Sequence, residues 1–182
     1  MSIINVVGAK IWGGGEQYVY DICKQLQQRH RTAYILVDQS NEDMQSRYAQ
    51  VGHVMTANLY ALKGFLSVNA VAKQMKEQGI HTIVCHSGKY ILFCIALKQL
   101  TGAKLVFIKH NLVPGKTDIY HRWINAQVDA FVCVSKLVYD DLMTPAIKDT
   151  SKYHVVYNGI DPNRFQSFSD AVPMKYKVRT CG

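Results

Sequence analysis

Three successive glycines, Gly13, Gly14 and Gly15, stand between an apolar run and a segment with helical periodicity. Glycines let the backbone approach a ligand closely and turn its N–H groups toward an anion. The positive end of the following helix dipole adds to that attraction. The pattern therefore favours phosphate binding by this loop. A glycine hinge that only lets the chain turn is the alternative.

Two well-known phosphate loops differ from this one. A P-loop ends in Gly-Lys-Ser/Thr, whereas Glu16 and Gln17 follow the glycines here. A dinucleotide fingerprint needs a further glycine where Tyr18 stands. Asp38, at the end of the second apolar run, still resembles the carboxylate that binds a ribose. A nucleotide-dependent oxidoreductase therefore stays open as an alternative.

Two histidines, His86 and His110, each follow an apolar run of strand length. A histidine in that position can hydrogen-bond a hydroxyl group or stabilise charge at a reacting centre, although a structural role is the alternative. Cys85 precedes His86, but adjacent strand residues point to opposite faces, which disfavours a Cys-His nucleophile. The sequence contains no Asp-x-Asp motif, so we expect no metal and no cofactor.

These residues are separated by alternating strand-like and helix-like segments. Runs such as residues 82–85 are almost entirely apolar, which is typical of parallel strands buried on both faces. We predict an α/β fold, a Rossmann-like doubly wound parallel sheet flanked by helices. The expected strands are residues 2–7, 32–37, 51–56, 81–86, 104–110, 130–135 and 153–158, and the expected helices are 16–28, 41–50, 63–79, 89–102, 118–127 and 136–143.

Ligands bind such folds beyond the carboxyl ends of the strands, at the point where the strand order reverses. This rule selects residues from several loops as candidates for binding. They are Gly8 to Gly15, Asp38, Cys85 to Lys89, Lys109 to Lys116, Ser135 and Asn158 to Asp161. Ser135 is first of all a candidate helix cap, as is Asp118 or Thr117 for the helix that follows them.

Composition limits the class of partner and the compartment. The 182 residues carry a net charge of +8, which attracts anions such as phosphorylated molecules or lipid headgroups. The basic residues are scattered without an arginine-rich or basic-aromatic motif, so nucleic acid is not expected. The 5 cysteines form no Cys-x-x-Cys pair and mostly lie in apolar segments, which favours a reducing, cytoplasmic setting. No apolar run is long enough to span a membrane.

From the glycine loop onward the chain resembles family 4 glycosyltransferases, which have the GT-B architecture. Five segments agree in order and spacing, and the corner at 155–165, VVYNGIDPNRF, is the most specific of them. The resemblance covers residues 2–168. The five segments are GGGEQYVYDICKQL, TIVCHSG, LVFIKHN, DAFVCVSKLVYDDL and VVYNGIDPNRF.

The resemblance implies a retaining transfer of a sugar from a nucleoside diphosphate sugar to a hydroxyl group of a glycan or lipid-linked acceptor. It implies no protein nucleophile and no metal. His110 would be the catalytic residue beside the donor sugar, and Lys116 would meet an acceptor phosphate. The implied donor-phosphate residues are Gly13, Gly14 and Gly15, and the implied acceptor residues are Gln17, His86, Asn111 and Lys116.

The resemblance also predicts the domain organisation. Residues 1–168 would form a Rossmann-like acceptor domain, closed by an interdomain corner at Asn158, Gly159 and Asp161. Residues 169–182 would be a linker and the truncated start of a second domain that holds most of the donor site. We therefore expect this chain by itself to be inactive. A non-catalytic phosphate- or glycan-binding module, or half of a two-chain transferase, remains the alternative.

One amphipathic segment raises the question of membrane contact. Residues 58–78 carry both apolar and lysine-bearing faces, and helices of this kind attach some members of the family to anionic bilayers. Peripheral membrane contact is therefore an expectation for this segment. The alternative is an ordinary amphipathic helix packed on the sheet.

Overall fold

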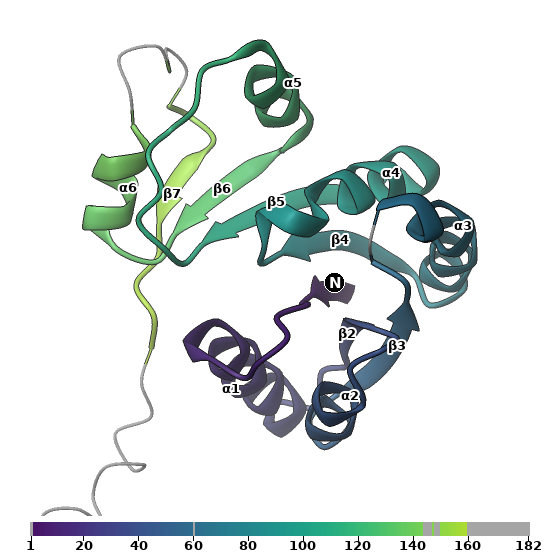
Figure 1. The fold of residues 1–182 in the computed structure, drawn as a ribbon. Helices are drawn as coiled ribbons and strands as arrows, with labels where there is room; N and C mark the ends of the chain where they lie inside the picture. Colours follow the sequence, from purple (N-terminus) through teal and green to yellow (C-terminus); the bar gives the residue numbers. More distant parts are fainter. Residues whose placement is uncertain (1, 60, 144–146, 148–149, 160–182) are drawn as a thin grey trace, which may run out of the picture.

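The computed structural model describes residues 2–59, 61–143, 147 and 150–159, with residues 61–66 described as backbone only. Strands and helices alternate along this part of the chain, as predicted (Figure 1). The strands are β1 (Ser2–Val6), β2 (Ala33–Asp38), β3 (His53–Ala57), β4 (Ile80–Cys85), β5 (Lys104–Lys109), β6 (Ala130–Cys133) and β7 (Tyr153–Val155). The helices are α1 (Gly14–Gln28), α2 (Glu42–Tyr48), α3 (Ala61–Glu77), α4 (Ile91–Thr101), α5 (Ile119–Gln127) and α6 (Lys136–Leu142), with a 3₁₀ turn at Gly88–Tyr90.

The strands form one parallel sheet in the order β3-β2-β1-β4-β5-β6-β7. The chain first builds outward from β1 to β3, and then returns to place β4 on the other side of β1. The strand order therefore reverses between β1 and β4. In an open α/β sheet this is where the loops after the strands separate and leave room for a ligand. The predicted doubly wound fold is confirmed.

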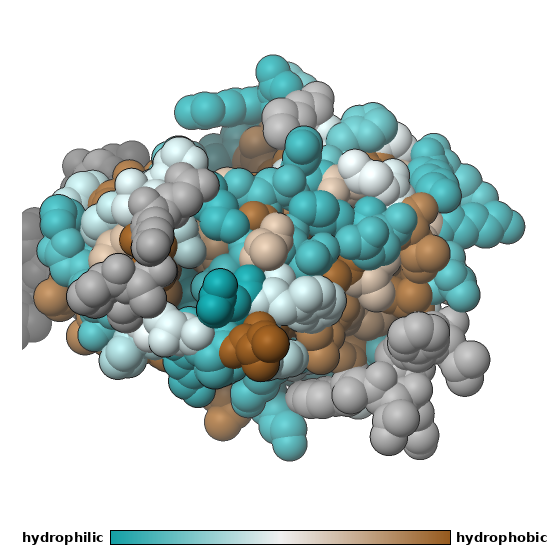
Figure 2. Space-filling view, turned by 90° about the horizontal axis from the view of Figure 1, so that it is seen from above, coloured by the Kyte–Doolittle hydropathy of each residue, from teal (hydrophilic) through white to brown (hydrophobic). Residues whose placement is uncertain are grey.

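Two apolar cores explain why these strands read as continuous hydrophobic runs. The helices α1 and α2 pack over β1 and β2 on one face, through residues such as Val19, Cys23 and Tyr48. The helices α3, α4 and α6 contribute to the core on the other face. Figure 1 shows α1 and α2 below the sheet and α3 and α4 above it. The side seen in Figure 2 is mostly hydrophilic, with apolar side chains in small separate groups.

The predicted helix ends are confirmed where a specific residue sets them. Gly102 ends α4 with φ 72°, and Gly79, just beyond α3, has φ 61°; both lie in the left-handed region that glycine adopts at little cost. The Asp118 side chain accepts from the backbone N–H of His121 at 3.1 Å. Ser135 accepts from the N–H of Val138 at 3.2 Å. These two side chains satisfy N–H groups that have no acceptor within their own helices.

The described part of α3 packs as an ordinary core helix. Val68, Val71 and Met75 are buried in the apolar core, while Lys73 and Glu77 are exposed and pair at 3.9 Å. Membrane contact by this segment stays a prediction, since the side chains of residues 61–66 lie outside the described set. Among the described residues, none of the helices combines the length and apolar character needed to cross a bilayer.

Most boundaries lie within one or two residues of the prediction, and two of the differences concern candidate site residues. Helix α1 begins at Gly14, two residues before the predicted start, because the glycines themselves form its first turn. Strand β7 stops at Val155, and the exposed residues Asn158 and Gly159 follow it as irregular backbone. Asp161, the third residue of the predicted interdomain corner, lies outside the described residues, as does the predicted domain boundary at 168/169.

Candidate functional site

The glycine loop leads directly into α1. Gly13 precedes the helix in extended backbone, and its N–H donates to the Glu16 carboxylate at 3.2 Å. Gly14 and Gly15 are the first two helical residues, and their N–H groups have no acceptor within the helix. Two backbone donors and the positive end of the helix dipole therefore lie beyond the end of β1.

The glycines of this loop differ in what the fold requires of them. A Cβ added at Gly14 would meet nothing within 4 Å, and one added at Gly15 would come no closer than 3.8 Å, to the His110 ring. A Cβ at Gly8, in contrast, would overlap the buried ring of Tyr90, whose hydroxyl donates to the Gly8 carbonyl. The fold therefore requires glycine at Gly8, and only a ligand would require it at Gly14 and Gly15.

His110 and His86 meet at the carboxyl ends of β5 and β4. His86 Nδ1 lies 3.1 Å from His110 Nε2, and the rings stack with centroids 5.4 Å apart. His86 Nε2 lies 3.0 Å from Oδ1 of Asn5, which is buried in β1. Tyr18 of α1 packs edge-on against His110, with centroids 5.3 Å apart. The switch point thus brings together one polar side chain from each of three neighbouring strands.

The hydrogen bonds that link Asn5, His86 and His110 determine which ring nitrogen of each histidine carries a proton. Because the Asn5 Oδ1 atom accepts, neutral His86 carries its proton on Nε2, and its Nδ1 must accept from His110 Nε2. Among the described residues, the remaining nitrogen of His110, Nδ1, has no hydrogen-bond partner. His110 therefore keeps one ring nitrogen for a ligand, whereas His86 keeps none.

Both histidines are held neutral. Burial lowers the pKa of His86 to about 3, and the neighbouring His110 contributes to the shift by charge repulsion. Burial also lowers the pKa of His110 below its ordinary value. Near neutral pH both histidines are therefore uncharged. The Nδ1 atom of His110 can then accept a hydrogen bond from a hydroxyl group.

The four predicted acceptor residues fall into two pairs. The Gln17 side chain accepts from Trp12 Nε1 at 3.1 Å and donates to Asp21 at 2.8 Å, and both ring nitrogens of His86 are engaged as described. Asn111 and Lys116, in contrast, line a pocket. In this structure the pocket pair is available to a ligand, while Gln17 and His86 hold other residues of the site in place.

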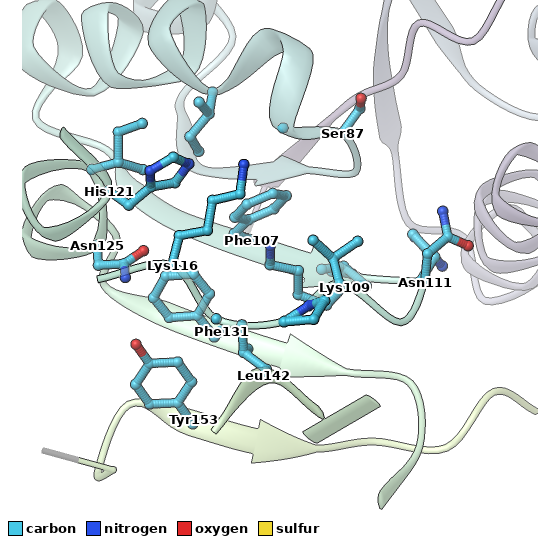
Figure 3. Close-up of a pocket in the computed structure, with 18 of the residues that line it drawn as sticks. Ser87, Phe107, Lys109, Asn111, Lys116, His121, Asn125, Phe131, Leu142 and Tyr153 are labelled. Atoms are coloured by element: carbon cyan, nitrogen blue, oxygen red, sulfur yellow. The ribbon is translucent and has the colours of Figure 1, made fainter. Parts of the chain in front are cut away.

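The pocket adjoins the histidine pair and extends beneath the loop that precedes α5. Its volume is about 380 Å³, and its walls include the end of β5, residues 111 and 113–116, and parts of α4, α5, β6, α6 and β7. Its apolar surface includes Ile91, Phe107 and Ile124. Figure 3 shows the lysines Lys109 and Lys116 directed into it. The sequence selected Lys109 only as the first residue of the candidate loop 109–116, and it did not select Asn5; each is a polar residue at or within an otherwise apolar strand.

Asp38, the candidate ribose ligand of the oxidoreductase alternative, is engaged within the fold. Its carboxylate accepts from the backbone N–H of Ser40 and from that of Leu59, each at 3.0 Å. Burial would raise the pKa of Asp38, but the hydrogen bonds from Ser40 and Leu59 outweigh it and lower the pKa. The residue orders the turn after β2, and both of its oxygens are occupied, which speaks against a ribose contact.

A metal centre is not apparent in the described part of the chain. There, no three His, Cys, Asp or Glu side chains gather as the ligands of a metal ion would. The expectation that neither metal nor cofactor takes part stays a prediction. The four described cysteines, Cys23, Cys85, Cys94 and Cys133, are free and buried, as small apolar side chains are.

Comparison with known proteins identifies the family. The model of Glycosyltransferase Family 4 matches residues 12–164. The chain belongs to glycosyltransferase family 4. The matched range includes the glycine loop, both histidines and the corner at Asn158, which are the segments that carried the resemblance in the sequence. None of the curated protein sequences matches this family 4 chain.

Solved structures show the same fold. A glycosyltransferase from Rickettsia africae ESF-5 superposes with a TM-score of 0.75 at 18% identity, over 91% of this chain and 45% of that one. Anabaena HepE in complex with UDP and glucose gives 0.69 at 18% identity, over 91% and 46%. Acinetobacter baumannii MurG gives 0.62 at 12% identity, over 95% and 50%. This family 4 chain thus spans about half the length of the structures it matches, as expected for one Rossmann-like half of a GT-B architecture.

Proposed function

We propose that this chain is the acceptor-side domain of a retaining glycosyltransferase. The complete enzyme transfers a sugar from a nucleoside diphosphate sugar to a hydroxyl group of a glycan or lipid-linked acceptor. Membership of family 4 supports glycosyl transfer. The solved complexes of HepE with UDP and with UDP-glucose support a nucleotide sugar as the donor. The retaining course is supported by the motifs of the sequence.

The observation that carries the proposal is the position of His110 beside the glycine loop. A Cβ at Gly15 would lie 3.8 Å from the His110 ring, so a group bound to the first N–H donors of α1 also reaches His110. The N–H groups of Gly14 and Gly15 would hold the donor diphosphate. Gly13, which has no side chain, would let the diphosphate come close to the backbone. Nδ1 of His110, which has no partner among the residues that the structure describes, would contact the transferred sugar or the charge that develops on it.

The chemistry is charge stabilisation and positioning. As the bond between the anomeric carbon and the diphosphate breaks, negative charge grows on the leaving oxygen, where the helix N–H groups would stabilise it. The acceptor oxygen then bonds to the anomeric carbon on the face that the diphosphate leaves, and its proton passes to the departing phosphate. No covalent enzyme intermediate is required. The acceptor would lie toward Asn111 and Lys116, the predicted acceptor residues that face the pocket.

The test is a transfer assay on the product of the complete gene with a panel of nucleotide sugars. We expect turnover with at least one donor and a product whose anomeric configuration, read by NMR, matches that of the donor. His110→Ala should lower kcat by about 100-fold, a typical loss for a group that stabilises a transition state. His81→Ala is the control, because His81 is exposed at the opposite end of β4.

The other outcomes separate the alternatives. An unchanged kcat in His110→Ala would return this residue to a structural role. If the complete gene product binds a nucleotide sugar but transfers no sugar, a non-catalytic binding module is favoured. Turnover that appears only when a separate chain is added would identify one half of a two-chain transferase.

A further inference from the structure

Lys109 is an unusual cation because it extends over an apolar face of the sheet. It is the last residue of β5, and side chains alternate along a strand, so it points to the face opposite His110. Its Nζ lies 4.6 Å from the centroid of the Phe107 ring. Its neighbour across the sheet is Cys133, a buried thiol. Burial lowers the pKa of Lys109, as expected for an ammonium group removed from water.

A half-buried ammonium normally has an anion beside it, and the described residues provide none for Lys109. In the described part of the chain it forms no ion pair, whereas Lys98, also largely buried, lies 2.7 Å from Asp129. Asp118, the carboxylate of the loop beside the pocket, is engaged at 3.1 Å by the N–H of His121 and at 2.6 Å by its ring. Removing an ammonium from water without a partner costs free energy, and none of the contacts among the described residues offsets this cost at Lys109 with an opposite charge.

The same pocket is lined by a second lysine. Lys116 is exposed, belongs to the loop after β5 and is directed into the same pocket as Lys109 (Figure 3). The lining residues Ser87 and Asn111 carry hydrogen-bond donors and lie at the edge of the pocket (Figure 3). A lysine ammonium is a compact charge, whereas the planar guanidinium of arginine binds a carboxylate through two parallel hydrogen bonds. Two positive charges and nearby neutral donors suit the dianionic form of a phosphate monoester.

We propose that this pocket is a phosphate site in which Lys109 and Lys116 bind the phosphate group of a ligand. This inference rests on the proposed function: the ligand is the acceptor, and the transferase adds a sugar to a phosphorylated molecule. His86 and His110 line the same pocket, so a ligand held by its phosphate at Lys109 would extend past the end of β5 toward the reacting centre. The apolar wall at Phe107 and Ile124 accommodates the part of the ligand between them.

The first experiment measures binding of inorganic phosphate by this chain, using calorimetry and NMR of the lysine ammonium groups. We expect phosphate to bind more tightly than acetate and to raise the pKa of Lys109, because an anion favours the charged form. Lys109→Met and Lys116→Met should each weaken binding at least about tenfold. The control Lys24→Met, which removes an exposed charge on α1, should leave binding unchanged.

A variant that fails to fold can be distinguished from one that has lost only the phosphate site. Lys109→Met replaces a charge in apolar surroundings by an apolar side chain of similar length, so its melting temperature should be equal to or above that of the wild type. Lys109→Arg keeps the charge and should retain phosphate binding within about threefold. The proposal is overturned if Lys109→Met binds phosphate like the wild type, if Lys109→Arg loses as much as Lys109→Met, or if the pKa of Lys109 does not move at saturating phosphate.

Two further probes identify the source of the phosphate. Tighter binding of glucose 1-phosphate than of inorganic phosphate supports a soluble phosphorylated acceptor. Lysine-dependent binding to phosphatidylcholine vesicles that contain phosphatidic acid supports a lipid-linked one. Failure of all three phosphate probes to bind overturns the proposal.

The proposed function is tested separately from the phosphate site, because it requires sugar transfer by the complete gene product. If phosphate binds through Lys109 and no sugar is transferred, the phosphate site stands and the proposed function fails. If sugar is transferred with the same acceptor KM in wild type and Lys109→Met, the transferase stands and the phosphate site fails.

Discussion

The side chains of His86 and His110 form one hydrogen-bonded unit. Asn5 fixes the proton of His86 on Nε2, and His86 in turn receives the Nε2 proton of His110. The catalytic candidate therefore depends on a buried residue of another strand for its tautomer. His86 acts in this unit as a positioning residue. Its predicted direct contact with an acceptor stays untested, and in this structure both of its ring nitrogens are occupied.

The pair predicts a specific dependence of stability on pH. The ordinary pKa of histidine, 6.5, is lowered to about 3 for His86 in the folded state. The unfolded chain therefore binds more protons between these values, and the free energy of unfolding should fall as the pH falls below 6.5. The slope from His86 is at most one proton, about 1.4 kcal/mol for each pH unit. Urea unfolding from pH 7 down to about 4.5 measures it, above the range where most carboxylates titrate.

A pair of variants isolates this effect. His86→Gln removes the titrating group and should flatten the pH dependence, whereas His81→Gln, at an exposed position, should not. The same slope in wild type and His86→Gln would show that the acid sensitivity arises elsewhere. In ¹⁵N spectra of the chain at pH 7, His86 should be the Nε2–H tautomer. A His86 that carries its proton on Nδ1 would contradict the assigned network.

At the scale of elements, the junction between β1 and α1 contains two kinds of glycine. Gly8 is in contact with the buried ring of Tyr90, and this contact joins the junction to the start of α4. Gly14 and Gly15 instead begin α1 and face open space and His110. Packing explains the first glycine. Packing gives no reason for the other two, and the proposed donor phosphate would supply one.

Matched substitutions test this division. Gly15→Ala should leave the free energy of unfolding within about 1 kcal/mol of the wild type, since alanine fits the helix and meets no close atom. Its methyl group would occupy the space beside His110, so sugar transfer by the complete gene product should be abolished. Gly8→Ala should destabilise the chain by about 1–3 kcal/mol, because the Tyr90 ring must move. Thermal and urea unfolding measure both, and wild-type turnover in Gly15→Ala would refute the donor-phosphate role.

At the scale of the whole molecule, the sheet holds the site at its most protected point. Strands β1 and β4 lie in the middle of the sheet, and each is paired on both sides. The apolar cores on the two faces include Val7 just after β1 and Ile83 of β4. We therefore expect Asn5 and His86 to be anchored where local unfolding costs most.

Amide hydrogen exchange tests this distribution of stability. The backbone N–H groups of β1 and β4 should exchange most slowly, with protection near that of global unfolding. Those of β3 and β7, at the two edges, should exchange faster, and β7 fastest of the strands because it has only 3 residues. Equal protection in β7 and β1 would contradict this ordering.

Much of the fold could be predicted from the sequence, because local signals set it. Apolar runs without alternation indicated buried parallel strands, and Asp118, Ser135, Gly79 and Gly102 marked helix ends. The less accurate boundaries were those without such a residue. The start of α1 was predicted too late because three glycines read as a loop, although their conformation is helical from Gly14 onward.

The sequence by itself determined the family, the order of the elements and the glycine–histidine constellation, because these depend on short motifs and on periodicity along the chain. Only the tertiary structure decided which side chains are available to a ligand. It turned His86 and Gln17 toward partners within the protein and linked Asn5 through His86 to His110. Within the part of the chain that the structure describes, it gave Lys109 no ion-pair partner beside the pocket. The physical reason is that hydrogen-bond satisfaction and burial depend on neighbours from strands far apart in sequence, which no local pattern specifies.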